Sequence, residues 1–283
     1  MPTLPVSEAE PVLGGFRFLE GPAWHPAERH LTFGDIPGDT LYRLGADGVL
    51  RTLRTPSNMA NGNTYDRQGR LLTCEHATSR VVRQEHDGTL TTLADRYRAR
   101  ELNSPNDVIV ARDGTVYFTD PLYGRRSPYG VPREPGQPVQ GVYGLGGRYR
   151  EPTLLVSDVE GPNGLCLSPD ERHLYVADTD RRHLRRFGVD GPHLTGGEVF
   201  AELAGDDPGE PDGLKVDSAG NVYSCGPGGL HVFDPDGTRR GVLRVPEVTA
   251  NFTWGDDDLR TLYLCASTTL YRCRTTVPGI PLF

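Results

Sequence analysis

The sequence predicts an all-β fold, a six-bladed β-propeller with four-stranded antiparallel blades around a central channel. Three observations predict it. First, the apolar residues fall in short continuous or alternating runs, without the longer 3.6-residue periodicity of helices. Second, Asp-Gly turns separate several of these runs. Third, one sequence phrase recurs six times. Gly and Pro, 35 and 24 of the 283 residues, supply the turns that many short strands need.

The strands and turns are read from local composition. Runs rich in Leu, Val, Tyr and Phe, such as 31–34, 71–74 and 116–119, are typical of short strands. Asp-Gly between apolar runs is the strongest short-range hairpin signal. It occurs at Asp47-Gly48, Asp87-Gly88, Asp113-Gly114 and Asp236-Gly237. We therefore expect antiparallel hairpins and almost no helix.

The repeated phrase is a polar residue, usually beside Gly or Pro, followed by a strand, a turn and a second strand. It starts at Glu20, Asn61, Asn106, Asn163, Asp212 and Asn251. The mean interval is about 46 residues, the size of one four-stranded blade. The second strands are expected to end at Asp35, Glu75, Asp120, Asp178, Gly226 and Cys265. These intervals predict six blades and a single propeller domain over residues 1–283.

The phrase starts should form a ring of side-chain oxygens. The first strand of each propeller blade lines the channel, so its first residues meet at one mouth, and the second strand returns to the same face. Buried carboxylates crowded in this way repel one another, and a divalent cation would relieve the repulsion. Carboxylate and amide oxygens suit Ca²⁺, Mg²⁺ or Mn²⁺, and the ring lacks the Cys and His ligands of a dedicated zinc site. The alternative, that these residues only form turns, stays open, above all for Asn61 and Asn251.

Composition argues against several classes of protein. The formal net charge of −8 is unsuited to sequence-independent binding of nucleic acid. There is no apolar run of roughly 18 residues, so a membrane protein is not expected. The N-terminus shows no secretory signal, which predicts a cytoplasmic location. Five widely spaced cysteines predict free thiols rather than a disulfide framework. The absence of a Gly-x-Ser-x-Gly elbow argues against a serine hydrolase.

Several motifs carry a resemblance to a known family. They are Leu19-Glu20-Gly21-Pro22-Ala23-Trp24, Asn103-Ser104-Pro105-Asn106-Asp107-Val108, Gly161-Pro162-Asn163-Gly164-Leu165, Pro211-Asp212-Gly213-Leu214-Lys215-Val216-Asp217 and Asn221-Val222-Tyr223. From about residue 13 to 270 the chain resembles the gluconolactonase / senescence-marker-protein (regucalcin) family. The resemblance implies a six-bladed propeller that hydrolyses sugar lactones with a divalent metal, commonly Ca²⁺, at the top of the channel.

The resemblance also implies roles for individual residues. Glu20, Asn163 and Asp212 would be the main metal ligands, with Asn106 as a fourth ligand or a substrate contact. Animal members of the family carry an Arg where this chain has Ser104, which leaves the sugar open. The Asn-Ser-Pro-Asn-Asp motif and the segment 118–124 look more like the bacterial gluconolactonase branch.

We therefore expect a metal-dependent lactonase with one divalent ion, most readily Ca²⁺, with Mg²⁺, Mn²⁺, Zn²⁺ or Fe²⁺ as alternatives. The metal would polarise the lactone carbonyl while a carboxylate activates the attacking water. Asp212 is the first candidate for this base and Glu20 the second. Asn106 and Asp120 would orient substrate hydroxyls, and the turn-rich segment 121–140 is expected to form part of a lid. Further candidates for substrate contact are Asn61, Tyr123 and His76, although the position of His76 favours a structural role.

Two alternative functions remain open on the sequence. A phosphotriesterase of the diisopropyl-fluorophosphatase type would use a similar oxygen ring. A calcium-binding propeller without catalytic activity would use it only to hold the ion. The expected partner is a small sugar lactone, with no nucleic acid and no membrane, and the expected state is a monomer or weak homodimer.

Overall fold

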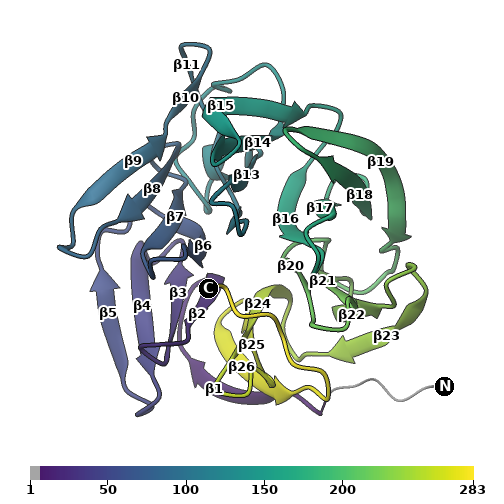
Figure 1. Cartoon of the computed structure of the whole chain (residues 1–283). Coiled ribbons are helices and arrows are strands. Elements are labelled where there is room, and N and C mark those ends of the chain that lie inside the picture. Colours follow the sequence, from purple (N-terminus) through teal and green to yellow (C-terminus); the bar gives the residue numbers. More distant parts are fainter. Residues whose placement is uncertain (1–6) are drawn as a thin grey trace.

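The computed structural model describes residues 7–283, which form six four-stranded antiparallel sheets around a central channel (Figure 1). The predicted six-bladed propeller is confirmed. Within this part of the chain a single short 3-10 turn, η1 (Tyr123–Arg125), is the only helical element. The predicted ends of the second strands are also confirmed, because five agree with the structure and Cys265 lies one residue before the end of its strand.

Each of the first five blades is built from four consecutive strands, with the innermost strand first. Blade I contains β2 (Leu19–His25), β3 (His30–Asp35), β4 (Thr40–Gly45) and β5 (Leu50–Arg54). Blade II contains β6 (Ala60–Tyr65), β7 (Leu71–Glu75), β8 (Arg80–Gln84) and β9 (Leu90–Ala94). The two short strands β10 (Arg96–Tyr97) and β11 (Arg100–Glu101) then form a separate hairpin.

The same order continues through the next three blades. Blade III contains β12 (Val108–Val110), β13 (Val116–Asp120), β14 (Gly141–Gly146) and β15 (Tyr149–Val156). Blade IV contains β16 (Pro162–Leu167), β17 (His173–Asp178), β18 (His183–Asp190) and β19 (His193–Glu202). Blade V contains β20 (Leu214–Val216), β21 (Val222–Gly226), β22 (Gly229–Phe233) and β23 (Arg239–Arg244).

The sixth blade closes the circle with both ends of the chain. Its three inner strands are β24 (Thr249–Gly255), β25 (Thr261–Ala266) and β26 (Thr269–Arg274), and its outer strand is β1 (Glu10–Gly14). In this antiparallel pair Glu10 lies opposite Arg272 and Gly14 opposite Thr269. β1 therefore covers an edge of β26 that would otherwise be unpaired.

The apolar core lies between neighbouring blades. One cluster joins Tyr223 and Val232 of blade V to Phe252 and Leu264 of blade VI, and the other clusters bridge further blades in the same way. Burial of these side chains is the main driving force that holds the sheets face to face. The packing leaves polar residues at the inner strand ends, where the channel opens.

In three of the six blades a repeated hydrogen-bond pattern ties the second strand to the start of the blade. Asp35, Asp120 and Asp178 each end a second strand, and each accepts two backbone N–H groups from the turn that enters the same blade. The donors are Arg17 and Phe18 at 3.0 and 3.0 Å, Asn103 and Ser104 at 2.8 and 2.8 Å, and Glu160 and Gly161 at 3.1 and 3.0 Å. These carboxylates explain part of the constant spacing in the repeat, because each one fixes the entry turn of its own blade.

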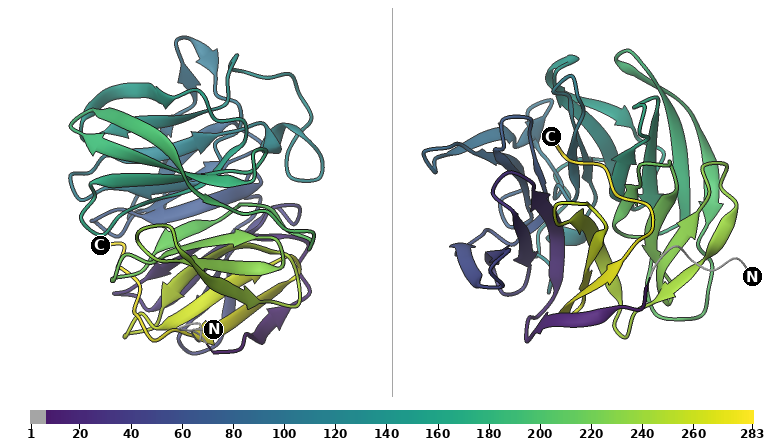
Figure 2. Two further views of the ribbon diagram at one scale, coloured as in Figure 1. Left: turned by 90° about the vertical axis from the view of Figure 1, so that its right-hand side faces the viewer. Right: turned by 60° about the horizontal axis from the view of Figure 1, so that its bottom comes forward.

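One connection is much longer than its counterparts. Residues 36–39, 76–79 and 179–182 link the second and third strands of blades I, II and IV, whereas residues 121–140 make this link in blade III. The side view shows that this loop and the C-terminus lie on opposite faces of the propeller (Figure 2). The predicted position of the loop, at the face where the second strands end, is confirmed by this topology.

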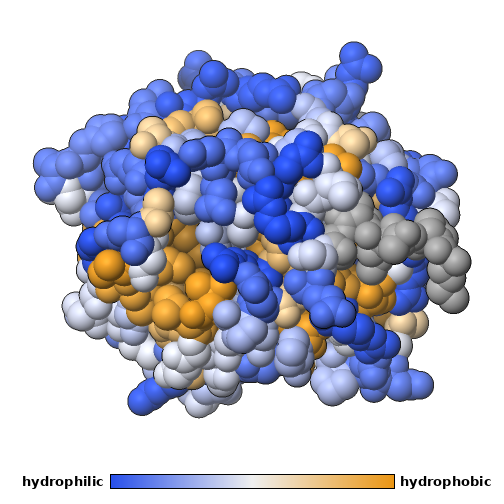
Figure 3. Space-filling model, turned by 90° about the horizontal axis from the view of Figure 1, so that it is seen from below, coloured by the Kyte–Doolittle hydropathy of each residue, from blue (hydrophilic) through white to orange (hydrophobic). Residues whose placement is uncertain are grey.

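The surface mixes hydrophilic and hydrophobic areas on the side seen from below (Figure 3). Large hydrophobic side chains that are clearly exposed in the described part of the chain are few: Val49, Leu90, Val131, Val199 and Val248. All five cysteines are buried with free thiols, as the sequence predicts. Across residues 7–283, no helix has the length and apolar character needed to cross a membrane.

Removal of residues 1–14 is expected to destabilise the whole propeller, because β26 loses its outer partner strand and its edge becomes unpaired. If each lost ladder hydrogen bond contributes about 1 kcal/mol, the loss is a few kcal/mol. This should lower the melting temperature by roughly 5–10 °C in thermal denaturation. A matched control lacks residues 1–6 only and retains β1. Equal melting temperatures for the two truncated proteins would contradict the closing role of β1.

Candidate functional site

The six predicted ring residues come together at one mouth of the channel. A Cβ atom added to Gly21 would lie 1.9 Å from the Asn61 carbonyl oxygen, and one added to Gly62 would lie 2.5 Å from that of Asn106. The same holds in later blades: a Cβ atom added to Gly164 would lie 2.3 Å from the Asp212 carbonyl oxygen, and one added to Gly213 would lie 2.4 Å from Asn251 Oδ1. Asn251 Nδ2 donates to Glu20 Oε2 at 2.9 Å and so links the last blade to the first. Five members are buried, and Asp212 is half-buried.

Two ring members are engaged by other protein groups. Asn251 uses both ends of its amide, since Nδ2 donates to Glu20 and Oδ1 accepts the Phe252 N–H at 2.9 Å. Asn61 Nδ2 lies 3.1 Å from His76 Nε2. The structure thus gives these two asparagines contacts within the protein, at the two positions where the sequence left a turn role most open.

The other four ring members keep oxygens that are not hydrogen-bonded. Glu20 Oε2 accepts from Gly21 N and Asn251, but Glu20 Oε1 accepts no hydrogen bond from residues 7–283. Asn163 Nδ2 donates to Thr179 Oγ1 at 3.2 Å, which leaves Oδ1 unused in the same part of the chain. Within these residues the Asn106 side chain forms no hydrogen bond, and no backbone N–H donates to the Asp212 carboxylate. This carboxylate lies beside the Asn163 amide.

Burial and mutual repulsion perturb the acids of the ring. Burial raises the pKa of Glu20 from 4.5 to about 7. Burial also raises the pKa of Asp212 well above its usual value, and the charges of Glu20 and Asp107 raise it further. A site with such carboxyl groups attracts cations and can hold or release protons near neutral pH.

Asp107 is a third carboxyl group at the site, and the sequence analysis did not single it out. Its Oδ1 accepts Val108 N at 2.9 Å, and its Oδ2 lies 3.4 Å from Leu165 N of blade IV. Burial raises its pKa, and the charge of Lys215, the only lysine of the chain, opposes that rise. One sequence feature could have identified Asp107: it occupies the position directly after the ring residue, where four other blades have Gly.

Asp120 lies beneath the long loop. Its two carboxylate oxygens accept the Asn103 and Ser104 N–H groups, each at 2.8 Å. Burial raises its pKa to about 7, although these two hydrogen bonds and the charge of Arg125 oppose the rise. The structure thus assigns Asp120 to the entry turn of blade III, and a contact with substrate hydroxyls stays a prediction.

His76 connects the ring to the long loop. Its Nδ1 lies 2.7 Å from the Tyr129 carbonyl oxygen, which can only accept, so Nδ1 carries the proton and donates. Nε2 then accepts from Asn61 Nδ2. Burial lowers the pKa of His76 to about 4, so the imidazole is neutral at pH 7. Both nitrogens are engaged, which agrees with the structural interpretation of this residue.

Tyr123 places its hydroxyl close to the ring. The Tyr123 hydroxyl is buried and unpaired at normal hydrogen-bond geometry within residues 7–283. A Cβ added to Gly161 would lie 2.4 Å from it. Burial raises the pKa of Tyr123; the neighbouring Thr179 hydroxyl opposes this rise, and the charges of Asp180 and Asp212 add to it. Tyr129 of the same loop packs on Phe18, with 4.8 Å between the ring centroids.

The donor set of the ring fits a hard cation only when amide oxygens are included. Among residues 7–283 no three His, Cys, Asp or Glu side chains are placed to hold a metal ion. The ring instead combines the carboxylates of Glu20 and Asp212 with the unused amide oxygens of Asn106 and Asn163. Carboxylate and amide oxygens of this kind suit Ca²⁺ or Mg²⁺.

The opposite mouth of the channel contains a separate cavity of about 360 Å³. Residues 280–283 border it together with inner strands of blades I to VI, and Lys215 and Trp254 are among its lining residues. None of the six ring residues lines this cavity. The ring and the cavity are therefore separate features of the channel.

Comparisons with known proteins agree with this architecture. The chain is 27% identical to the gluconolactonase of Zymomonas mobilis, with 95% of this chain and 82% of that protein covered. It is 30% identical to the pentonolactonase of Haloferax volcanii, with 88% and 81% covered. The solved structure of a gluconolactonase from Xanthomonas campestris is 34% identical and superposes with a TM-score of 0.89, covering 95% of this chain and 89% of that one.

The match to a family extends over nearly all of the blades. The family model of the SMP-30/gluconolactonase/LRE-like region matches residues 18–268. This range begins one residue before β2 and ends in the turn before β26. The chain therefore belongs to the SMP-30/gluconolactonase family.

Proposed function

We propose that this protein hydrolyses sugar lactones and that one divalent cation is held by Glu20, Asn106, Asn163 and Asp212. The observation that carries the proposal is the set of oxygens left free in the ring. Glu20, Asn106 and Asn163 each keep an oxygen without a hydrogen bond from residues 7–283, and Asp212 receives no backbone donor within them. The names of the relatives, a gluconolactonase and a pentonolactonase, support sugar lactones as the substrate class.

The charges around the ring favour a dication. Glu20, Asp107 and Asp212 bring three negative charges when ionised, and Lys215 brings one positive charge close enough to affect the first two. A cation with two charges would balance this group. Ca²⁺ is the first candidate because it accepts carboxylate and amide oxygens in flexible numbers, with Mg²⁺ and Mn²⁺ next and Zn²⁺ or Fe²⁺ less suited.

Asp212 is the proposed general base. A divalent cation bound at the ring would supply Lewis-acid polarisation of the lactone carbonyl. Asp212 is the most exposed member of the ring, so a water molecule can reach its carboxylate. The carboxylate takes a proton as the water oxygen bonds to the carbonyl carbon. The ring C–O bond then breaks, and the leaving oxygen receives the proton from Asp212, which gives the open hydroxy acid. Glu20 is the second candidate for this base.

Substrate hydroxyls are proposed to contact Asn106 and Tyr123. The Tyr123 hydroxyl stands beside Thr179 and close to Asp212, and it makes no hydrogen bond of normal geometry among residues 7–283. Ser104 is unsuited to this role because its Oγ donates to the Pro121 carbonyl at 2.6 Å and accepts Gly124 N at 3.0 Å. Ser104 thus stabilises the start of the loop, and we expect other residues to recognise the sugar.

Asp212→Asn is expected to lower kcat for gluconolactone at least about 100-fold, because the amide cannot accept the proton. Initial rates in a pH-stat with Ca²⁺ present test this, and circular dichroism should show an unchanged fold. The matched control is Glu210→Gln, which removes a nearby exposed carboxylate that pairs with Arg182. Near wild-type turnover of the Asp212→Asn protein would rule out Asp212 as the base. Turnover of a phosphotriester but of no lactone would favour the phosphotriesterase alternative.

Glu20→Gln is expected to change how stability depends on pH in the metal-free protein. The folded-state pKa of about 7 lies above the ordinary 4.5, so the folded state binds more protons than the unfolded state between these values. The Glu20 contribution to stability therefore falls as pH rises from 4.5 to 7, by up to about 3 kcal/mol. Urea unfolding in chelator at pH 5, 6 and 7 should show that the free energy of unfolding of the Gln variant increases relative to that of the wild type as pH rises. Parallel pH curves would contradict the raised pKa.

A further inference from the structure

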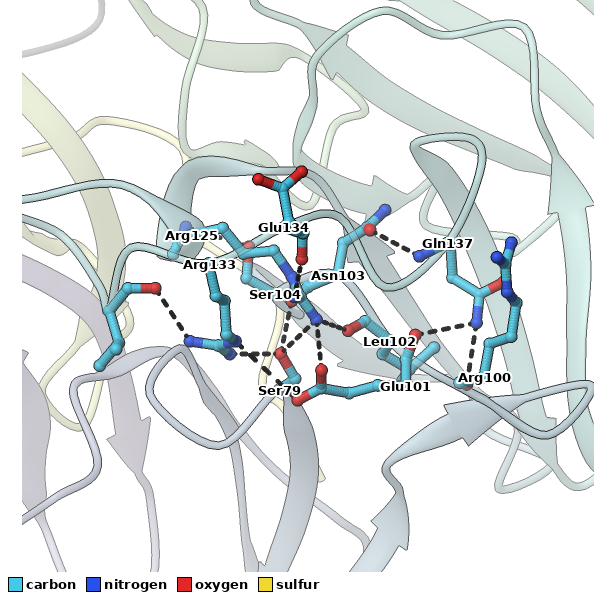
Figure 4. A network of polar contacts seen from close by, with 12 residues as sticks. Ser79, Arg100, Glu101, Leu102, Asn103, Ser104, Arg125, Arg133, Glu134 and Gln137 are labelled. Atoms are coloured by element: carbon cyan, nitrogen blue, oxygen red, sulfur yellow. Dashed lines mark hydrogen bonds and ion pairs between the residues drawn. The ribbon is translucent and has the colours of Figure 1, made fainter.

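Arg125 is a buried arginine at the end of η1, two residues after Tyr123, with 5% of its surface exposed. Its guanidinium contacts groups from three parts of the chain (Figure 4). Nε donates to the Asn103 carbonyl at 2.6 Å. Nη2 lies 2.5 Å from the Leu102 carbonyl, 2.8 Å from Glu101 Oε2 and 3.2 Å from Ser79 Oγ, and Nη1 donates to the Glu134 carbonyl.

The segment that Arg125 holds leads directly into the ring. Residues 101–103 precede Asn106 by only a few residues, and Asp120 fixes the N–H groups of Asn103 and Ser104. Ser104 Oγ donates to the Pro121 carbonyl and accepts Gly124 N. The start of the long loop and the approach to Asn106 are therefore hydrogen-bonded to each other directly before Arg125 in the sequence.

The returning limb of the loop is fixed to the same segment. Gln137 Nε2 donates to the carbonyl oxygens of Tyr97, Arg100 and Glu101 at 3.1, 2.9 and 2.9 Å. Arg133 Nη2 donates to the His76 carbonyl at 2.9 Å and to Ser79 Oγ at 2.5 Å. Ser79 Oγ itself donates to the Asn103 carbonyl at 2.5 Å. Ser79 thus joins both guanidinium groups to the segment before Asn106.

The chemistry of this network requires a guanidinium. Four of the contacts are to uncharged groups, and the one carboxylate, Glu101, has a side chain that is 48% exposed. A buried cation is costly unless its hydrogen-bond donors are satisfied. Arginine offers five donors in a rigid plane, whereas lysine offers three on a flexible stem. Apolar side chains would suffice to attach a loop, but they would not fix its position through directed hydrogen bonds.

We propose that Arg125 is a positioning residue that holds Tyr123 and Asn106 in one fixed arrangement and thereby sets how tightly the lactone binds. The proposal rests on the lactonase function proposed above. Arg125 does not touch the substrate. It acts through the Tyr123 hydroxyl, which η1 places near Asp212, and through the segment 101–103 that leads to Asn106.

The test is a double-mutant cycle with Arg125→Lys and Tyr123→Phe, measured as kcat and KM for gluconolactone in the Ca²⁺-loaded protein. Loss of one hydrogen bond to the substrate corresponds to about a tenfold change. Tyr123→Phe should therefore raise KM about tenfold with little change in kcat. Arg125→Lys should raise KM at least as much, and the double variant should be no worse than Arg125→Lys alone. Multiplying effects would overturn the proposal, because they would mean that Arg125 does not act through Tyr123.

Hydrogen–deuterium exchange tests the positioning without relying on activity. Arg125→Lys should speed exchange in residues 121–140 and 101–106, and unchanged exchange there would overturn the proposal. If Arg125→Lys does not fold, Ser79→Ala takes its place as the test variant. It removes the hydroxyl shared by both guanidiniums and should also speed exchange in these residues, by less than the loss of the whole Arg125 network would. The matched control Arg182→Lys alters an exposed arginine paired with Glu210 and should change neither KM nor exchange. A wild type inactive on every lactone, with faster exchange in Arg125→Lys, would refute the proposed function and leave the positioning intact.

Discussion

The close approach of the six inner strands around the channel is the constraint on which the rest of the structure depends. At Gly21, Gly62, Gly164 and Gly213 even a methyl group would overlap an atom of the following blade. The residue before each glycine is brought with its neighbours to a single mouth. A propeller closed this tightly therefore concentrates whatever side chains stand at those positions, and in this chain they all carry oxygen.

Electrostatic crowding follows directly from that packing. Glu20 and Asp212 have raised pKa values mainly because they are buried; the charge of Asp107 raises both pKa values further, and the charge of Glu20 adds to the rise at Asp212. The apolar clusters between blades, such as the one around Tyr223 and Phe252, begin directly beside the ring and offset this unfavourable contribution to stability. A substitution in the ring can change the reactivity of the site while leaving the contacts between sheets in place.

Much of the fold was predictable because residues at equivalent positions of the sequence repeat occupy equivalent positions in the blades. The sixfold recurrence of one phrase from Glu20 to Asn251 predicted six blades, and the second-strand ends such as Asp35 and Asp178 followed from their near-constant distance after each start. Asp107 escaped prediction because a carboxylate beside Asn106 looks like one more turn residue until the neighbouring blade is seen. The engagement of both His76 nitrogens and the contacts of Arg125 also escaped it. They join side chains from irregular segments tens of residues apart, where no periodicity exists to read.

The long loop of blade III leaves and re-enters the sheet at adjacent positions, because Asp120 lies directly opposite Gly141 in the ladder between β13 and β14. The sheet therefore has the same geometry whatever length of chain joins these two residues. A replaced insert would leave the β13–β14 ladder in register, and it would have to reproduce the contacts of Arg125 to keep the segment before Asn106 in place. This site offers protein engineers a natural place to graft loops from relatives and so to alter substrate preference on an unchanged scaffold.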